Sequence, residues 1–349
     1  MIKSLKLKDF RGIKKGKLNF APITILLGPN NSGKTAILEA LFLAPNPFRR
    51  VPYMLSKSYE TRAIDVVLSL HETLDSKSLI TLFHNYVSDT IELELNCSYD
   101  EKYTLRFITD NKHVFVSTSK ELKDAQTKII KGMKVHWFGV ISKSPHQYGP
   151  IYFQDALIEN TLLISTNLMK SAFWYLKSNW APIVNTGICK KVAKEFSSFT
   201  YEKYTNITIE PFINDTYSIN ALLEDGRRIR LGDLGAGAQI YIIARILSEF
   251  EEPEVLLWDD IESHFNPRIL LKIADWFADL IEKNKQVIIS THSLEAIKII
   301  AGLNEEVTSI LLTLLDDDNN LKVKELKLKD VEDLLESGID VRVAESLIL

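Results

Sequence analysis

The octapeptide from Gly28 to Thr35 constrains this chain more than any other segment. Its sequence, GPNNSGKT, fits the pattern G-x-x-x-x-G-K-[S/T] without a mismatch. An apolar run over 23–27 precedes it, and a helical pattern over 34–43 follows it. A strand, a glycine-rich turn and a helix N-terminus together aim backbone N–H groups and a positive dipole end at one point. The segment therefore predicts a phosphate-binding loop.

Different residues of the loop are expected to bind the phosphates of a nucleotide and its metal ion. Lys34 is expected to reach the β- and γ-phosphates, and the Thr35 hydroxyl to bind Mg²⁺. ATP and Mg²⁺ are thus the expected cofactors. The other candidates for nucleotide contact belong to the loop and the start of its helix: Gly28, Asn30, Asn31, Ser32, Gly33 and Ala36.

Composition sets outer limits on the class of protein. The chain has 349 residues, 46% of them hydrophobic and 25% charged, which is ordinary for one large α/β domain with an insertion or for two domains. The net charge of −4 argues against a globally basic nucleic-acid binder and leaves a local basic surface open. Two cysteines without a metal-like pairing indicate a reducing compartment. Since no apolar run has signal-peptide or membrane-spanning length, we expect a cytoplasmic protein without a membrane partner.

A second apolar strand, over 255–258, ends in carboxylates. Asp259, directly after this strand, is expected to hold Mg²⁺, directly or through water. Asp260 follows as the candidate that polarises the attacking water, and Glu262 is a second candidate catalytic residue. The alternative is an acidic helix N-terminus favoured by the helix dipole alone.

Two further segments are typical of a nucleotide-hydrolysing site. The buried strand predicted over 287–290 is followed by His292, a candidate γ-phosphate sensor or water-orienting residue. A glycine-dense stretch over 231–239 enters a helix predicted over 240–250. A glycine-rich helix start is another anion site, although a plain strand-to-helix turn would have the same sequence.

The order of these motifs resembles the ABC-type ATPases, and within them the AAA ATPases of the SMC, RecF and OLD (overcoming-lysogenization-defect) type. The resemblance rests on the phosphate loop, the opening over 2–12, the segment 259–267 and the sequence STHS over 290–293. The ending over 337–342 also resembles the shorter members. The motifs cover roughly the first 50 residues and 225–300. SMC-type arms need long heptad runs, which are absent, and too few residues follow the strand-end histidine for a TOPRIM nuclease domain.

The resemblance implies an ATP-dependent homodimer with composite sites. ATP is then held by the phosphate loop of one chain and, in trans, by Gly235, Gly237 and Gln239 of the other. It implies that Asp260 acts as the general base and His292 as the γ-phosphate sensor. It also implies slow ATP hydrolysis in DNA repair, genome maintenance or anti-phage or mobile-element defence, with DNA and a separate nuclease or effector as candidate partners.

Three departures from the group's pattern bear on this expectation. Asp260 stands where the group has glutamate, and a base shorter by one methylene holds water less well. No clear serine precedes the signature glycines. The glutamine that links phosphate sensing to the lateral lobe has three equal candidates, Gln126, Gln147 and Gln154. The alternative function is therefore a nucleotide-gated binding module with little or no hydrolysis. A small-molecule kinase is a third alternative, but no sequence motif indicates a pocket for a phosphate acceptor.

These observations predict an α/β fold: a P-loop NTPase with an ABC-type head and a mixed sheet flanked by helices. The core is expected over 1–47 and 206–349, and an inserted lobe over 48–205. Short alternating runs predict an antiparallel meander in the first part of this insertion, with strands at 63–70, 90–97, 103–108 and 113–117. The pattern over 155–200 is helical.

Two charged segments allow more than one interpretation. The N-terminal hairpin is rich in lysine and either contacts nucleic-acid phosphates or forms a solvated face. Arg11, at its turn, is the candidate for nucleotide contact. The acidic run over 316–318 is either a metal site or, as we expect, a solvated hairpin tip, because consecutive carboxylates on a turn point apart.

Overall fold

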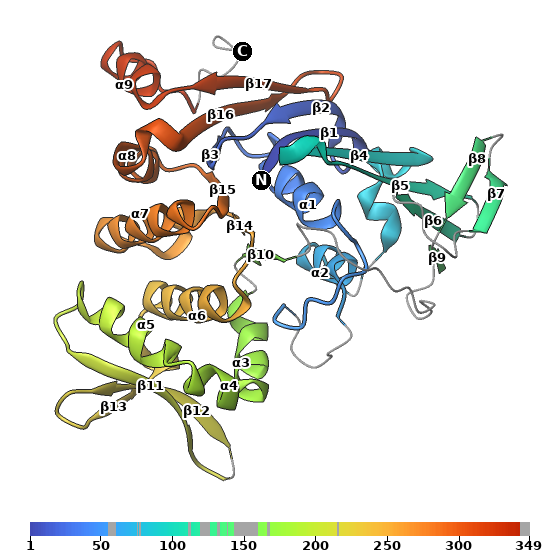
Figure 1. The fold of residues 1–349 in the computed structure, drawn as a ribbon. Coiled ribbons are helices and arrows are strands. Elements are labelled where there is room, and N and C mark those ends of the chain that lie inside the picture. The colour runs from blue at the N-terminus through green and yellow to red at the C-terminus, as the bar shows by residue number, and fades with distance from the viewer. Residues whose placement is uncertain are drawn as a thin grey trace.

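Two six-stranded sheets with a helix between them form the framework of the molecule (Figure 1). The computed structural model describes residues 1–54, 61–74, 76, 78–110, 113–118, 126–130, 133–137, 139–142, 160–165, 168–214 and 216–342. No helix among these residues is long and apolar enough to cross a membrane.

The central sheet carries the predicted phosphate loop, and its strand order is β10-β14-β15-β3-β16-β17. All neighbours are parallel except β16 and β17, so the sheet is mixed as predicted. Its inner strands are continuous apolar runs because helices or the other sheet cover both faces. The bounds are β10 Thr161–Ile164, β14 Val255–Trp258, β15 Gln286–Thr291, β3 Ile23–Leu27, β16 Thr308–Leu315 and β17 Leu321–Leu326.

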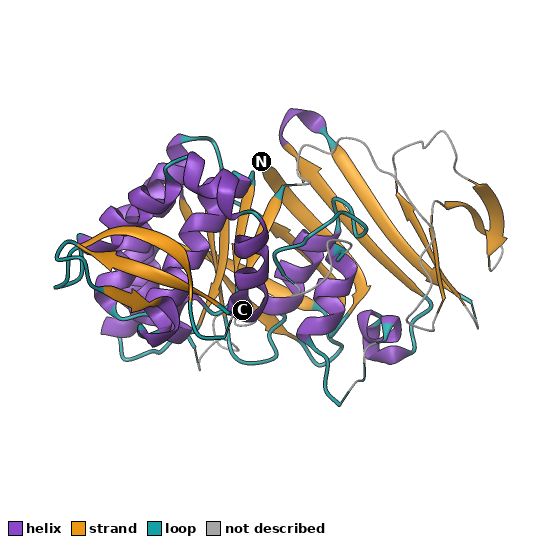
Figure 2. Ribbon diagram, turned by 90° about the horizontal axis from the view of Figure 1, so that it is seen from below, coloured by secondary structure: helices purple, strands orange, loops and turns teal. Residues whose placement is uncertain are grey.

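The second sheet is antiparallel throughout, and Figure 2 shows it extending away from the helix-covered central sheet. Its order is β2-β1-β4-β5-β6-β9. Three strands of the predicted meander are confirmed as β4, β5 and β6, and β4 pairs with β1, which makes the meander continuous with the N-terminal hairpin. The bounds are β1 Ile2–Phe10, β2 Ile13–Asn19, β4 Thr90–Cys97, β5 Lys102–Thr109, β6 His113–Thr118 and β9 Gly139–Ser142.

Helices cover both faces of the central sheet. Helix α1, Lys34–Leu43, lies between the two sheets and contacts β1, β14 and β15 (Figure 1). The helices of the opposite side are α6 Ala236–Glu251, α7 Pro267–Glu282 and α8 Leu294–Leu303, with α9 Leu328–Glu336 beyond α8.

A smaller lobe packs against α6. It contains α3 Leu168–Ser178, α4 Trp180–Asn185 and α5 Ile188–Ser197, with a three-stranded sheet of β11 Tyr204–Pro211, β12 Tyr217–Leu223 and β13 Arg228–Arg230. A separate pair, β7 Gln126–Ile130 and β8 Met133–Trp137, lies beyond β6 (Figure 1).

The strand predicted over 63–70 is wrong, because Ala63–Leu70 forms helix α2. Its β-branched residues favoured a strand, but Ile64, Val67 and Leu68 recur at helical spacing and are buried together. Asp65 also caps the helix start by accepting the N–H of Arg62 at 3.1 Å. Tertiary burial thus decided the structure of a segment whose composition was ambiguous.

The helical pattern predicted over 155–200 also requires a correction, because Thr161–Ile164 is strand β10 at the edge of the central sheet. A four-residue apolar run does not distinguish a buried strand from a helix by periodicity. Within the described residues, each large sheet combines strands from 1–47 or 206–349 with strands from 48–205. The predicted domain boundaries stay a prediction.

Candidate active site

The backbone of the phosphate loop explains its glycines. Gly28 has a φ of 156°, and a Cβ there would lie 2.3 Å from the carbonyl oxygen of Thr313. Gly33, the residue before α1, has a φ of 90°, and Asn31 has a φ of 62°. The left-handed region is open to glycine and tolerated by asparagine. Ser32 is buried, and its hydroxyl lies 3.1 Å from that of Thr313.

The ammonium group of Lys34 is folded back onto the loop. It donates hydrogen bonds to the carbonyl oxygens of Gly28 and Pro29, both at 2.9 Å. Burial lowers the pKa of Lys34, and the carboxylate of Asp260, with two others of the same turn, opposes this shift. The remaining loop candidates lie nearer the surface, since Asn30 and Asn31 are exposed and Ala36 is half-buried.

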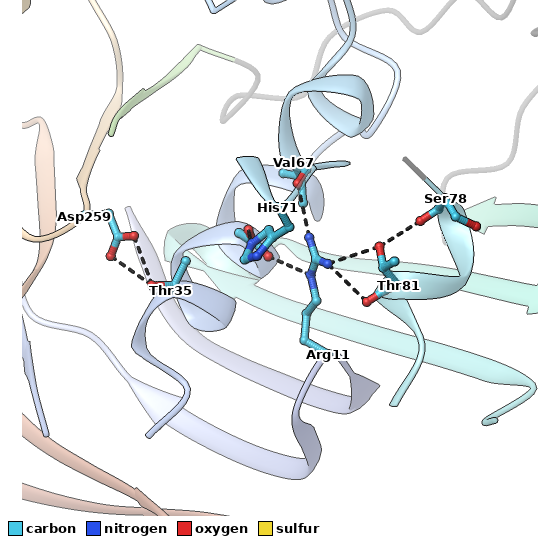
Figure 3. A network of polar contacts seen from close by, with 8 residues as sticks. Arg11, Thr35, Val67, His71, Ser78, Thr81 and Asp259 are labelled. Atoms are coloured by element: carbon cyan, nitrogen blue, oxygen red, sulfur yellow. Dashed lines mark hydrogen bonds and ion pairs between the residues drawn. The ribbon is translucent and has the colours of Figure 1, made fainter. Parts of the chain in front are cut away.

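The two metal-site candidates are in contact, as Figure 3 shows. The Thr35 hydroxyl donates to the Asp259 carboxylate at 3.0 Å, and the Ser290 hydroxyl donates to the same carboxylate at 2.6 Å. Burial raises the pKa of Asp259, and hydrogen bonds from Ser290 and Thr35 partly oppose the shift. The parallel register of β14, β15 and β3 brings these three side chains to one edge of the sheet.

This oxygen pair fits Mg²⁺, which takes one or two protein oxygens together with water and substrate phosphates. No cluster of three or more histidine, cysteine or acidic side chains suited to a metal occurs in the described part of the chain. Thr35 and Asp259 are therefore the residues that would hold the ion. When bound, Mg²⁺ would supply positive charge that offsets the negative charge of the nucleotide phosphates.

Asp260 occupies a strained position beside the metal pair. Its φ is 49° and its ψ is 59°, in the left-handed region. The Asp260 N–H donates to the Ser290 hydroxyl at 2.8 Å, and the Asp260 carbonyl accepts from Ser263. These bonds hold the turn, and the half-buried carboxylate stands next to Asp259 at the carboxyl edge of the sheet.

Glu262 faces the end of β15. Its Oε2 accepts a hydrogen bond from the Thr291 hydroxyl at 2.7 Å, and its Oε1 accepts the backbone N–H of His292 at 2.5 Å. Asp260, Glu262 and His292 are thus brought together from two strand ends. The sequence analysis missed the contributions of Ser290 and Thr291, whose signal was their place directly before the strand-end histidine.

The glycine-rich signature lies at the start of α6, and Figure 1 places this helix on the other side of the central sheet from α1. Gly235 is exposed and Gly237 is buried. Gln239 donates its side-chain amide to the carbonyl oxygens of Leu234 at 2.7 Å and Gly232 at 3.3 Å, closing the loop. The structure does not bring the signature to the phosphate loop of its own chain.

The predicted nucleotide contact of Arg11 stays a prediction, and the structure shows which groups of its own chain Arg11 contacts. Its guanidinium donates to the Glu39 carboxylate at 2.9 Å, to the Thr81 carbonyl and hydroxyl, and to the Val67 carbonyl (Figure 3). His71 Nε2 lies 2.5 Å from the other oxygen of Glu39. Arg11 therefore joins α1 to α2 inside the fold.

The structure tests the prediction for the acidic run over 316–318 but not the one for the three glutamine candidates. The acidic run is confirmed as a hairpin tip between β16 and β17, where the Asp316 carboxylate accepts the N–H groups of Asp318 and Asn320 and pairs with Lys322. The glutamine candidates stay untested, because Gln147 and Gln154 lie outside the described residues and only the backbone of Gln126 is described.

A phosphate loop and a carboxylate-ended strand separated by β15, with a glycine-rich start of α6 on the opposite side of the sheet from α1, define a P-loop ATPase of the ABC type. The AAA ATPase domain family matches residues 1–148. An AAA domain family described with the AbiEii toxin of type IV toxin–antitoxin systems matches residues 192–298. Both family matches are to AAA ATPase domains, and they fit the ABC-type AAA ATPases that the motifs resemble.

Known proteins similar to this chain agree with that assignment. An ATP/GTP phosphatase of Helicobacter pylori (strain ATCC 700392 / 26695) is 24% identical over 337 residues, which are 86% of this chain and 87% of that protein. The DNA double-strand break repair Rad50 ATPase of Methanopyrus kandleri is 34% identical over 70 residues, which are 19% of this chain and only 8% of that protein.

Two solved structures share the fold. The SmcHead bound to the C-winged helix domain of ScpA has a TM-score of 0.54 at 14% identity, with 95% of this chain and 99% of that one covered. An Smc head domain with an extended coiled coil, bound to the C-terminal domain of ScpA derived from Pyrococcus furiosus, has a TM-score of 0.51 at 13% identity, with 96% and 98% covered. These likenesses confirm the predicted fold class.

Proposed function

We propose that this protein hydrolyses ATP slowly with Mg²⁺. The observation that carries the proposal is the contact between Thr35 and Asp259, beside the loop-bound ammonium of Lys34. In this arrangement Lys34 neutralises phosphate charge and Asp260 orients or deprotonates the attacking water. His292 senses the γ-phosphate. The Helicobacter pylori relative is named an ATP/GTP phosphatase, which supports nucleoside triphosphate hydrolysis by this chain.

We further propose that ATP closes a homodimer in which the signature acts in trans. A Cβ built at Gly232 or Gly235 meets no atom within 4 Å, so nothing in the described chain requires glycine at these positions. Close approach of a ligand or another backbone is a common reason for glycine. The γ-phosphate of ATP on the facing phosphate loop, approached by Gly235, supplies that reason.

We propose DNA repair, genome maintenance or defence against phage or mobile elements as the setting, with DNA and a separate nuclease or effector as partners. The local match to a Rad50 repair ATPase supports this setting. A groove on the face of β1, β2 and β17 carries five lysines interspersed with Glu92 and Glu94, and offers cations to phosphates. Its lysines are Lys6, Lys8, Lys15, Lys17 and Lys322. Two buried, free cysteines, Cys97 and Cys189, support a reducing, cytoplasmic location.

The second candidate function is a nucleotide-gated binding module with little hydrolysis. It is favoured by the short side chain of Asp260, which reaches less far toward a water than glutamate does. A strong rise in turnover in Asp260→Glu would indicate that the native protein is tuned to remain in its ATP-bound state. This result would support the nucleotide-gated binding module.

The decisive experiment measures ATP turnover with Mg²⁺, alone and with single- or double-stranded DNA, beside Lys34→Ala. We expect turnover in the native protein, stimulation by DNA and loss in the variant. ATP binding without turnover under every condition would overturn the enzymatic proposal. Sedimentation with and without ATP tests the dimer in the same samples.

A further inference from the structure

The end of strand β15 is attached, residue by residue, to the acidic turn after β14. The Ser290 hydroxyl bridges Asp259 and Asp260, since it donates to the carboxylate of the first and accepts the N–H of the second. The next two residues of the strand end, Thr291 and His292, both donate to Glu262. Three successive residues before α8 are therefore held by three acidic residues of one turn.

The carboxylate of Glu262 is held at both of its oxygens by the end of β15. Its two carboxylate oxygens each accept a hydrogen bond from the β15 end, at 2.7 and 2.5 Å. The Thr291 hydroxyl that donates to Glu262 also accepts the N–H of Ser293, the N-cap of α8, at 3.0 Å. The carboxylate is thus part of a hydrogen-bonded chain that runs from the turn to the start of α8.

We propose that Glu262 is a positioning residue that fixes the main chain at His292 and so aims its side chain at the γ-phosphate. A backbone N–H has one direction, and a carboxylate that accepts it fixes the peptide plane from which the imidazole projects. Loss of this bond lets the sensor move relative to Asp260. This inference rests on the proposed ATP hydrolysis, and it assigns to Glu262 a role distinct from that of the base.

Paired substitutions separate positioning from proton transfer. In Glu262→Gln, the amide oxygen still accepts from His292 and the NH₂ group donates to the Thr291 hydroxyl, so the attachment persists. Glu262→Ala removes both bonds. We expect the alanine variant to lose kcat by about 10- to 100-fold, the range for Å-scale misplacement, while the glutamine variant retains most of it and KM changes little in both.

Substitutions of Thr291, which donates to Glu262, test the same attachment from the other side. Thr291→Val removes the hydroxyl at nearly constant volume and should lower kcat by several fold, whereas Thr291→Ser should restore it. Glu295→Gln, an equal charge change on the exposed first turn of α8, is the matched control and should leave turnover unchanged. Equal and complete loss of kcat in Glu262→Gln and Glu262→Ala would overturn positioning and identify Glu262 as the base.

Amide hydrogen exchange over 288–294 without nucleotide tests the bond from His292 to Glu262 independently of ATP hydrolysis. We expect Glu262→Ala to lose protection at His292, and Glu262→Gln and Glu295→Gln to keep it. If native protein shows no turnover but this exchange pattern holds, the attachment stands and hydrolysis fails. Unchanged protection in Glu262→Ala overturns the attachment itself.

Discussion

The Thr35 hydroxyl donates a hydrogen bond to the Asp259 carboxylate at 3.0 Å across a sequence separation of 224 residues. Thr35 opens α1, and Asp259 follows β14, with β15 between β14 and the strand that leads into the loop. The metal pair is therefore assembled by sheet topology rather than by a local motif. Any change that shifts the register of β14 against β15 and β3 separates it.

Asp259→Asn should stabilise the nucleotide-free protein at neutral pH. Burial raises the pKa of Asp259 above its ordinary value of 3.8, so the folded state favours the protonated carboxyl and loses that advantage as pH rises through the raised pKa. Asparagine stays neutral and keeps a donor and an acceptor for Thr35 and Ser290. Urea unfolding from pH 3 to 8 should show the advantage of the variant growing with pH. A constant difference at all pH values would contradict the cause.

Asp260→Asn should lower turnover by about 10²- to 10⁴-fold, the usual contribution of a general base, without weakening ATP binding. Asparagine adopts the left-handed backbone at this position as readily as aspartate does, so the turn should persist. Steady-state turnover and equilibrium binding of a fluorescent ATP analogue measure the two effects separately. Native-like turnover in this variant would remove Asp260 from the chemistry.

Arg11→Ala should destabilise the protein by about 3–5 kcal/mol, because it leaves the Glu39 carboxylate buried without its main cationic partner. The side chains of Arg11 and Glu39 are only 10% and 2% exposed. Lys17→Ala, on the exposed face of the same hairpin, is the control and should change stability by less than about 0.5 kcal/mol. If the arginine variant unfolds like native protein but fails to bind ATP, the original prediction of nucleotide contact was right.

Gly235→Ala should leave the monomer intact and weaken the ATP-dependent dimer. Its φ of −58° and ψ of 147° suit alanine, and the added methyl group meets no atom of the described chain within 4 Å. Gly28→Ala is the contrasting variant, since its methyl group collides with the Thr313 carbonyl and should disrupt the loop. Thermal unfolding and sedimentation with ATP distinguish the two. An unchanged dimer in Gly235→Ala would argue against contact in trans.

Prediction from sequence succeeded where local chemistry sufficed. The phosphate loop follows from eight consecutive residues, and β3, β14 and β15 follow from apolar runs that only a doubly covered sheet explains. These runs also placed Asp259 and His292 at strand ends. Parallel strands then carry such residues to one edge without further information.

The sequence could not supply the contacts that a side chain makes with distant parts of the chain. Arg11 was expected to contact nucleotide because it adjoins the loop, and its hydrogen bonds to Glu39, Val67 and Thr81 could not be read from the sequence. Glu262 was a catalytic candidate because it follows Asp260 by two residues, and its partners Thr291 and His292 could not be read from the sequence.

The N–H of Asp259 donates to the carbonyl oxygen of Ile164 at 2.9 Å, where β10 ends. Helix α3 of the smaller lobe begins four residues further along, at Leu168. A partner that binds this lobe therefore binds next to a strand that is hydrogen-bonded to the metal-site residue Asp259. The edge strand of the central sheet is in this sense the link between the smaller lobe and the metal-site residue.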